Sequence, residues 1–402
     1  MVEDLRCYRL NMKGSVDGMA QLVEVPGKLP IAKTHSERRF YQPELDGLRF
    51  YAFLGVFVCH TLPVHETSYR GLHVPLPWLW PAIVESGGSG VDLFFALSAF
   101  LITSLLLRER QETGSVALRL FYIRRILRIW PLYFLVVALG IVMAQPKQRH
   151  LWYYTQSLPW YYVAGYLLFA ANWVYAAFGA AQSICAPLWT VSIEEQFYLI
   201  WPVLVKLLER RAVIVVGIAT FLLATVSQVA ILLSGTKGNY IYFGSASRCD
   251  SLALGIMLAL YADRLPKLTA GMRILLVTGG VIGCLVSWAW LDQPRLIVFG
   301  HLMISLSSGA ILYGTLGSSN KLVTGEWVVR LGKISYGLYM LHTTGLLIML
   351  SLFRPGHGWK LLATMALGFL MTVLLAFASY RWIESPFLRL KTRFATVPSR
   401  PI

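Results

Sequence analysis

Charged residues are scarce in this sequence, and their scarcity argues against a water-soluble fold. Asp, Glu, Lys and Arg make up 14% of the 402 residues, while 56% are hydrophobic. A soluble domain carries charge on roughly a quarter of its residues. Several apolar runs are long enough to cross a bilayer, which takes roughly 20 residues. We therefore expect lipid to solvate much of the chain.

Cysteine motifs and a signal sequence are missing as well. The five cysteines contain no CxxC pair, and most of them lie in or beside apolar segments. This pattern argues against a disulfide framework and against a zinc site, so we expect neither a metal nor a permanently bound cofactor. The first 45 residues contain charges, Gly and Pro but no apolar stretch, which argues against a cleavable signal peptide.

The sequence has a large excess of positively charged residues. Its 36 Lys and Arg outnumber 20 Asp and Glu and give a formal net charge of +16. These residues lie in short loops between apolar segments, as the positive-inside rule describes. Topology and attraction to anionic membrane lipids therefore explain the charge better than nucleic-acid binding. The connection 108–128 contains six arginines and is predicted to be cytoplasmic.

The apolar segments predict an all-α, polytopic transmembrane bundle of about ten helices. The expected spans are 45–62, 90–107, 129–144, 188–208, 212–233, 248–262, 272–291, 296–316, 331–352 and 360–383. The aromatic segment 161–178 is predicted to be re-entrant or interfacial, because ten spans place both termini in the cytoplasm and an eleventh would move the basic C-terminal tail outside. We expect a cytoplasmic, partly disordered tail over 1–44, one membrane domain over 45–392 and a C-terminal tail over 393–402.

The first predicted span carries Arg49 and His60, and ionisable groups inside spans are functional candidates. The two residues are 11 positions apart, or ~1100° at ~100° per residue, so they share one helix face. A rise of ~1.5 Å per residue separates them by roughly 16 Å along the axis. Each could be structural alone, but in register they suggest an anion clamp near the cytoplasm and a general base, His60, deeper in the membrane.

Three carboxylates are candidates to assist His60. Asp92 begins the second span, where a helix N-terminus alone would also favour it. Glu194 and Glu195 are adjacent and point about 100° apart, so one could face the site while the other pairs with an arginine. We predict that one of these three carboxylates orients the His60 imidazole, and the residues leave open which one it is.

The remaining candidates divide between two sides of the membrane. Arginine clusters bind phosphates well, so an inner patch would hold an anionic donor through Arg49, Arg124, Arg125 and Arg128. An outer patch would bind an acceptor hydroxyl through Ser192, Trp189, Arg248, Asp250, Tyr339 and His342. A single histidine in an apolar helix, such as His342, is more often a buried residue with its hydrogen bonds completed by neighbours than a catalytic residue. The two patches together suit transfer of a group across the bilayer.

These motifs together resemble the membrane acyltransferase-3 family of carbohydrate O-acyltransferases. The resemblance runs from Glu44 to about Arg389. It is carried by ELDGLR at 44–49, His60, GVDLFF at 90–95, FYIRRILRIWP at 121–131, LWTVSIEEQFY at 188–198, RCD at 248–250, ISYGLYMLH at 334–342 and WIESP at 382–386. Ser98-Ala99-Phe100 departs from the Ser-Gly-Phe that the family usually has.

The resemblance implies acetyl-CoA, or another short acyl-CoA, as cytoplasmic cosubstrate and a carbohydrate hydroxyl as acceptor, in a bacterial cytoplasmic membrane. It implies that Arg49 and His60 are the family's Arg and His. A C-terminal extracytoplasmic domain, which some members carry, is not expected. A transient acyl-His60 is a variant of the mechanism. A transporter or flippase of a polar or glycan substrate is the alternative, although transporters usually show internal repeats and we find none. The acceptor's identity and the oligomeric state stay open.

Overall fold

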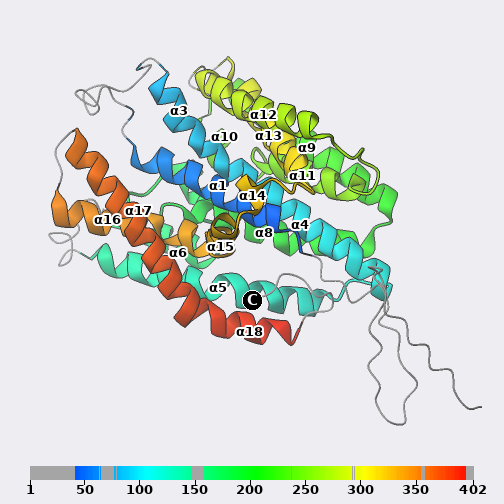
Figure 1. Cartoon of the computed structure of the whole chain (residues 1–402), viewed down its shortest axis with the longest axis horizontal. Helices are drawn as coiled ribbons and strands as arrows, with labels where there is room; N and C mark the ends of the chain where they lie inside the picture. Colours follow the sequence, from blue (N-terminus) through cyan, green and yellow to red (C-terminus); the bar gives the residue numbers. More distant parts are fainter. Residues whose placement is uncertain are drawn as a thin grey trace, which may run out of the picture. The chain divides into compact units, whose positions relative to one another are not determined.

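The computed structural model describes residues 41–62, 64, 77, 79–145, 157–236, 238–291, 293, 295–354 and 358–394, which are helical almost throughout and contain no strand (Figure 1). The first helix begins at Pro43 and the last ends at Thr392. Residues 1–40 and 395–402, which include most of both predicted tails, lie outside the described residues.

Each of the ten predicted spans contains a helix. They are α1 (Pro43–Thr61), α4 (Gly90–Thr113), α5 (Leu118–Met143), α8 (Leu188–Leu207), α9 (Arg210–Leu233), α11 (Cys249–Tyr261), α12 (Ala270–Leu291), α13 (Ile297–Thr315), α16 (Ser335–Phe353) and α17 (Trp359–Ser379). Among the described residues, seven helices are long and apolar enough to cross a membrane. The other three are α11, which has 13 residues, and α1 and α8, whose charged residues lower their hydropathy. The predicted polytopic helical bundle is confirmed.

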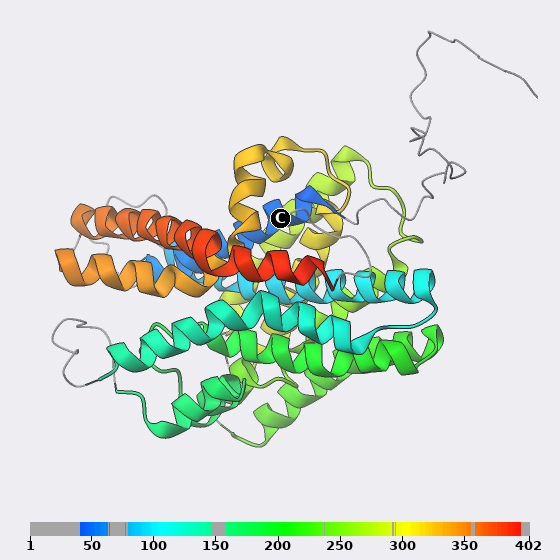
Figure 2. The same cartoon turned by 90° about the horizontal axis from the view of Figure 1, so that it is seen from below.

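Two long helices shape the bundle. The turns α3 (Trp80–Ser86) and η2 (Gly87–Ser89) run directly into α4, and this rod crosses α1 at glycines. A Cβ atom on Gly87 would lie 2.2 Å from the Gly55 carbonyl oxygen, and one on Gly90 would lie 2.2 Å from the Ala52 oxygen. Because only glycine permits so close an approach, these contacts fix α1 against α4. The second rod joins α17, a π-helical turn (Tyr380–Glu384) and α18 (Ser385–Thr392), and it passes α16 and α5 (Figures 1 and 2).

The aromatic segment forms a hairpin of two short helices, α6 (Trp160–Leu167) and α7 (Ala171–Phe178). Eight residues rise roughly 12 Å, too little to span a membrane. The rings of Tyr161 and Phe178 meet at the open end, 4.5 Å apart. The tip residue Phe169 reaches the middle of α5, where its ring lies 4.5 Å from that of Tyr133. The prediction that this segment does not span is confirmed.

One glutamine of α8 satisfies the polar groups at the hairpin tip. The Gln196 amide donates to the Phe169 carbonyl at 2.9 Å and to the Asn172 side-chain oxygen at 3.0 Å. Asn172 is fully buried and donates to the Phe243 carbonyl at 3.1 Å. Irregular backbone at membrane depth is stable only where protein groups satisfy it. These bonds also fix the turn of α8 that carries Glu194 and Glu195.

Successive helices alternate in direction, so the bundle has two ends. We name the basic end as the one where α4, α8, α11 and α13 finish and where α1, α5, α9, α12 and α16 begin. The short helices α14 (Lys321–Thr324) and α15 (Glu326–Lys333) pack beside the start of α1 at this end. His60, near the last turn of α1, lies toward the opposite end. The chain therefore presents its arginine-rich loops on one side.

Candidate active site

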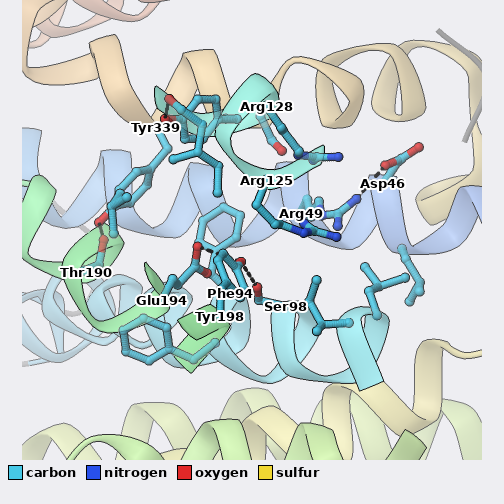
Figure 3. A pocket seen from close by; sticks show the side chains of 18 of the residues that line it. Asp46, Arg49, Phe94, Ser98, Arg125, Arg128, Thr190, Glu194, Tyr198 and Tyr339 are labelled. Atoms are coloured by element: carbon cyan, nitrogen blue, oxygen red, sulfur yellow. Dashed lines mark hydrogen bonds and ion pairs between the residues drawn. The ribbon is translucent and has the colours of Figure 1, made fainter. Parts of the chain in front are cut away.

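A cavity of about 170 Å³ opens between α1, α4, α5, α8 and α16. Figure 3 shows Arg49, Arg125 and Arg128 gathered toward one part of it and Thr190, Glu194 and Tyr339 toward the other. Apolar side chains of α4, among them Phe94, line the wall between these groups. The cavity thus joins a cationic region to a region of hydroxyl and carboxyl groups.

The three arginines differ in how they are held. Arg49 forms an ion pair with buried Asp46, with 3.0 Å between nitrogen and oxygen. Arg125 lies over the rings of Phe121 and Tyr198, with its guanidinium carbon 5.4 and 5.3 Å from the ring centroids. Within the described residues, neither Arg125 nor its neighbour Arg128 forms an ion pair. Two cations are therefore available to an anionic ligand.

Arg124, which was predicted to act with them, lies elsewhere. Its guanidinium pairs with the buried Glu109 carboxylate at 3.0 Å and donates to the Phe394 carbonyl at 2.8 Å. The Glu109 carboxylate also accepts from the Ala117 backbone N–H at 2.9 Å. Arg124 does not line the cavity; in this structure its ion pair with Glu109 joins α5 to α4.

A hydrogen-bonded chain forms one wall of the cavity. The Tyr198 hydroxyl donates to the Glu194 carboxylate at 3.2 Å, and Ser98 bonds to the same tyrosine oxygen. Further along α8, the Thr190 hydroxyl bonds to the Tyr339 hydroxyl at 2.9 Å. Thr190 and Tyr198 were not among the predicted site residues. Their four-residue spacing from Glu194 places all three on one helix face, and that spacing was the signal available in the sequence.

His60 pairs with His342 rather than with a carboxylate. The Nδ1 atom of His60 lies 2.8 Å from the Nε2 atom of His342, and the two rings are nearly parallel. His342 is fully buried, whereas His60 is exposed. The pair joins α1 to α16, two helices far apart in the sequence.

The hydrogen bonds of this pair fix its tautomers. The Nδ1 atom of His342 lies 2.6 Å from the Tyr339 carbonyl oxygen, which can only accept, so this nitrogen carries the hydrogen. In a neutral pair, Nε2 of His342 must then accept from Nδ1 of His60. The Nε2 atom of His60 is left with a free lone pair, as a general base requires.

Replacing His342 tests this arrangement. In His342→Phe the Nδ1–H of His60 loses its acceptor, so the tautomer and ring orientation are no longer fixed. If His60 is the general base, we expect kcat to fall at least about tenfold. His342→Gln, whose amide oxygen can accept, should recover part of the activity. Steady-state kinetics should show an unchanged KM for the donor in both variants. Equal kcat in His342→Phe and the wild type would refute the pairing.

The predicted carboxylate partner of His60 is therefore wrong. Glu194 accepts from Tyr198, and Glu195 accepts from the Trp130 indole at 3.3 Å. Asp92 forms a buried ion pair with Arg248 at 2.8 Å. A backbone carbonyl, reached through His342, takes the orienting role that we expected a carboxylate to have.

Asp92, Arg248 and Asp250 belong to a buried polar network between α4, α9, α11 and α13. Arg248 bonds to His301 at 2.8 Å in addition to Asp92. Ser251 donates to Asp92 at 3.0 Å, and Gln228 donates to Asp250 at 3.3 Å. All of these side chains are buried, and none lines the cavity. The network cross-links four helices.

Asp92→Leu tests that structural role. Removing one partner of a buried ion pair leaves an uncompensated charge and typically costs about 3–5 kcal/mol. We expect a lower thermal midpoint and less folded protein after solubilisation, with unchanged kcat per folded molecule. Ser251→Ala, which loses one neutral hydrogen bond, should cost about 1 kcal/mol. An Asp92→Leu protein that melts like the wild type but is inactive would instead assign Asp92 to catalysis.

Two further predicted contact residues are held by their neighbours. Trp189 packs against the rings of Tyr242 and Phe243 at 5.5 and 5.0 Å. The buried Ser192 hydroxyl donates to the Leu188 carbonyl of its own helix at 3.2 Å. Neither residue lines the cavity. Both stabilise the start of α8 in this structure.

Tyr339 connects the cavity to the histidine pair. Its ring lies 5.5 Å from that of Phe94 on the cavity side and 5.6 Å from that of His342. Its hydroxyl bonds to Thr190, and its carbonyl orients His342. The arrangement places a base behind an aromatic wall of an arginine-lined cavity.

The chain matches a known protein family and several curated relatives. The model of the acyltransferase domain family, acyltransferase-3, matches residues 42–381. The chain is 27% identical over 379 residues to the peptidoglycan O-acetyltransferase OatA of Listeria monocytogenes, covering 88% of this chain and 57% of the relative. It is 27% identical over 389 residues to the O-acetyltransferase OatA of Staphylococcus aureus strain NCTC 8325, covering 92% and 61%.

The chain thus spans about three fifths of the length of these relatives. No solved structure matches. The family match covers most of the chain, including α1, the histidine pair and all of the cavity lining except Tyr41 and Lys391. The chain therefore belongs to the acyltransferase-3 family.

Proposed function

We propose that this enzyme moves an acetyl or other short acyl group from cytoplasmic acyl-CoA to a hydroxyl of a carbohydrate acceptor. The observation that carries the proposal is the arginine-lined cavity that ends at Tyr339, directly in front of the His342–His60 pair. A phosphate-bearing donor bound to the arginines would then extend along the cavity toward a proton-accepting base.

The donor side follows from the arginines. Arg49, Arg125 and Arg128 lie at the cationic region, and guanidinium groups bind phosphates through charge-assisted hydrogen bonds. A cavity of about 170 Å³ is smaller than the roughly 300–1,000 Å³ of pockets that enclose a drug-sized ligand. The cavity suits the narrow acyl-pantetheine arm of the donor, while the nucleotide part of coenzyme A would lie outside the cavity. Acyl-CoA acts here as a cosubstrate, and no permanently bound cofactor is invoked.

The acceptor side follows from His60. Its Nε2 lone pair takes the proton of the acceptor hydroxyl, whose oxygen forms a bond to the thioester carbonyl carbon. The carbon–sulfur bond breaks, and the proton passes from the imidazole to the departing thiolate of coenzyme A. The Tyr339 ring must turn aside for the thioester to reach this base. The exposure of His60 leaves room for an acceptor to approach from the opposite end of the bundle.

Carbohydrate as the acceptor class is supported by the relatives, one of which is named a peptidoglycan O-acetyltransferase. We assign the basic end, with both termini of the membrane domain, to the cytoplasm of a bacterial cell, because arginine-rich loops mark the cytoplasmic side. The transporter alternative has no supporting observation beyond polar groups within the bundle. In this orientation the donor binds from the cytoplasmic side of the membrane and the acceptor from the opposite side.

The direct test supplies acetyl-CoA, labelled in the acetyl group, to membranes containing the enzyme and follows the label. We expect labelled ester on the extracted glycans of wild-type membranes and none with His60→Ala. Label released as free acetate, with none on any glycan, would point to hydrolysis instead. Movement of unmodified glycan without any acyl transfer would support a transporter.

A further inference from the structure

A second cleft, of about 1110 Å³, lies at the basic end between α4, α9, α11, α12 and α13. Apart from Gln42 at its rim, it shares no lining residue with the donor cavity. In Figure 1 these five helices gather on one side of α1. We propose that this cleft binds an anionic phospholipid, with the headgroup phosphate held by its arginines.

Three arginines in the cleft are held in place by helix C-termini. Arg110 donates to the carbonyls of Val205 and Leu208 at 2.8 and 2.6 Å, at the end of α8. The Arg210 side chain donates to the Leu260 carbonyl of α11 at 2.6 Å. These bonds fix each guanidinium through one nitrogen, and a guanidinium has five N–H donors. Donors therefore remain for a ligand.

Arg273 is the third of them and repeats the arrangement at the end of α13. It donates to the carbonyls of Gly314 and Leu316 at 3.1 and 2.5 Å. Across the described residues, Arg110, Arg210 and Arg273 form no ion pair with a carboxylate. The cleft therefore contains three positioned guanidinium groups whose charge is not cancelled by a neighbouring side chain.

The charge of the cleft is strongly positive. Its lining contains five basic side chains and two acidic ones, a net excess of three positive charges. Arg108 and Glu112 neutralise each other at 2.7 Å, so Asp263 is the acidic group that remains against Lys267 and the three arginines. Because guanidinium groups bind phosphates through charge-assisted and often bidentate hydrogen bonds, the charge suits a phosphate ligand.

The apolar residues in and beside the cleft favour a phosphate carried by a lipid over a soluble phosphate. The cleft has an apolar floor that includes Phe100, Leu107 and Leu260. Just beyond its basic residues, α9 and α12 present exposed aliphatic side chains, Val215 at 63% and Ile274 at 63%. Such faces are solvated by acyl chains in a bilayer. A phospholipid could thus place its phosphate on the arginines and its chains along α9 and α12, which a soluble phosphate could not do.

The binding test uses purified full-length enzyme in vesicles or nanodiscs of phosphatidylglycerol or of phosphatidylcholine, with bound lipid counted by native mass spectrometry. We expect retained phosphatidylglycerol and a higher thermal midpoint in that lipid. The variant carrying Arg210→Gln and Arg273→Gln should lose roughly fivefold in lipid affinity per charge, about 25-fold in total. Arg210→Lys with Arg273→Lys keeps both charges and should retain most of the binding.

Matched controls separate a site from general attraction to a charged membrane. Arg211→Gln with Arg264→Gln removes the same charge from neighbouring exposed residues that do not line the cleft and should leave lipid retention unchanged. Equal loss in this control, or equal retention of both lipids, would overturn the proposal. Displacement of the lipid by coenzyme A or by inorganic phosphate would also overturn it, by assigning the cleft to a soluble phosphate.

Discussion

His60→Ala is expected to lower kcat for acyl transfer by about 10²–10⁴-fold, the usual contribution of a general base. The alanine variant has no group that can take the proton of the acceptor hydroxyl, while the donor cavity is unchanged. KM for acetyl-CoA should therefore stay near the wild-type value. The measurement is initial-rate transfer to an added glycan acceptor, normalised to folded enzyme.

Cys59→Ala is the matched control, because Cys59 precedes His60 on α1 and takes no part in the proposed chemistry. It should transfer at the wild-type rate. Near-normal transfer by a properly folded His60→Ala protein would refute the role of the histidine pair.

Replacing Arg125 and Arg128 is expected to act on donor binding. Hydrogen bonds to charged groups contribute about 1.5–3 kcal/mol each, and 1.36 kcal/mol is a factor of ten. Arg125→Gln and Arg128→Gln should thus each raise KM for acetyl-CoA by more than about tenfold. Neither cation pairs with a carboxylate of the described residues, so folding should be affected little. Initial rates over a range of acetyl-CoA concentrations give the values.

Arg124→Gln provides the contrast, because Arg124 is adjacent in sequence but pairs with Glu109 outside the cavity. We expect it to lower the thermal midpoint while leaving the KM for acetyl-CoA unchanged. A rise in KM that is equal in all three variants would show that general charge, and not the cavity, attracts the donor.

Hydropathy and loop charge were sufficient to predict the bundle. The ten helices follow from apolar length, since a chain in lipid must satisfy its backbone within helices. Loop charge predicted that 161–178 does not span. One boundary differs at a polar, glycine-rich stretch. The second predicted span, 90–107, is part of a helical rod that runs from Trp80 to Thr113. The residues Glu85-Ser-Gly-Gly-Ser89 favour a break in the sequence, but in the structure the end of α3 and the turn η2 carry the rod through them, and Gly87 packs closely against Gly55 of α1.

The contents of the cavity were predicted in part. Arg49, Arg125, Arg128, Glu194 and Tyr339 all line it. From the sequence we had divided them between an inner and an outer side, whereas the structure brings them into one cavity. The sequence could not show which helices are neighbours. His60 contacts His342 because α1 packs against α16. Asp92 contacts Arg248 because α4 packs against α11. His301 lies in an apolar helix, and no sequence motif identified it as a member of the buried network.

We propose above that the donor binds at the basic end and that His60, as general base, activates an acceptor hydroxyl that approaches from the opposite end. Sealed membrane vesicles of both orientations, given labelled acetyl-CoA from outside, test this most directly. We predict labelled glycan in inside-out vesicles, strongly reduced label in right-side-out vesicles, and none in either with His60→Ala. Equal labelling in the two orientations, or labelling that persists in His60→Ala, would contradict it.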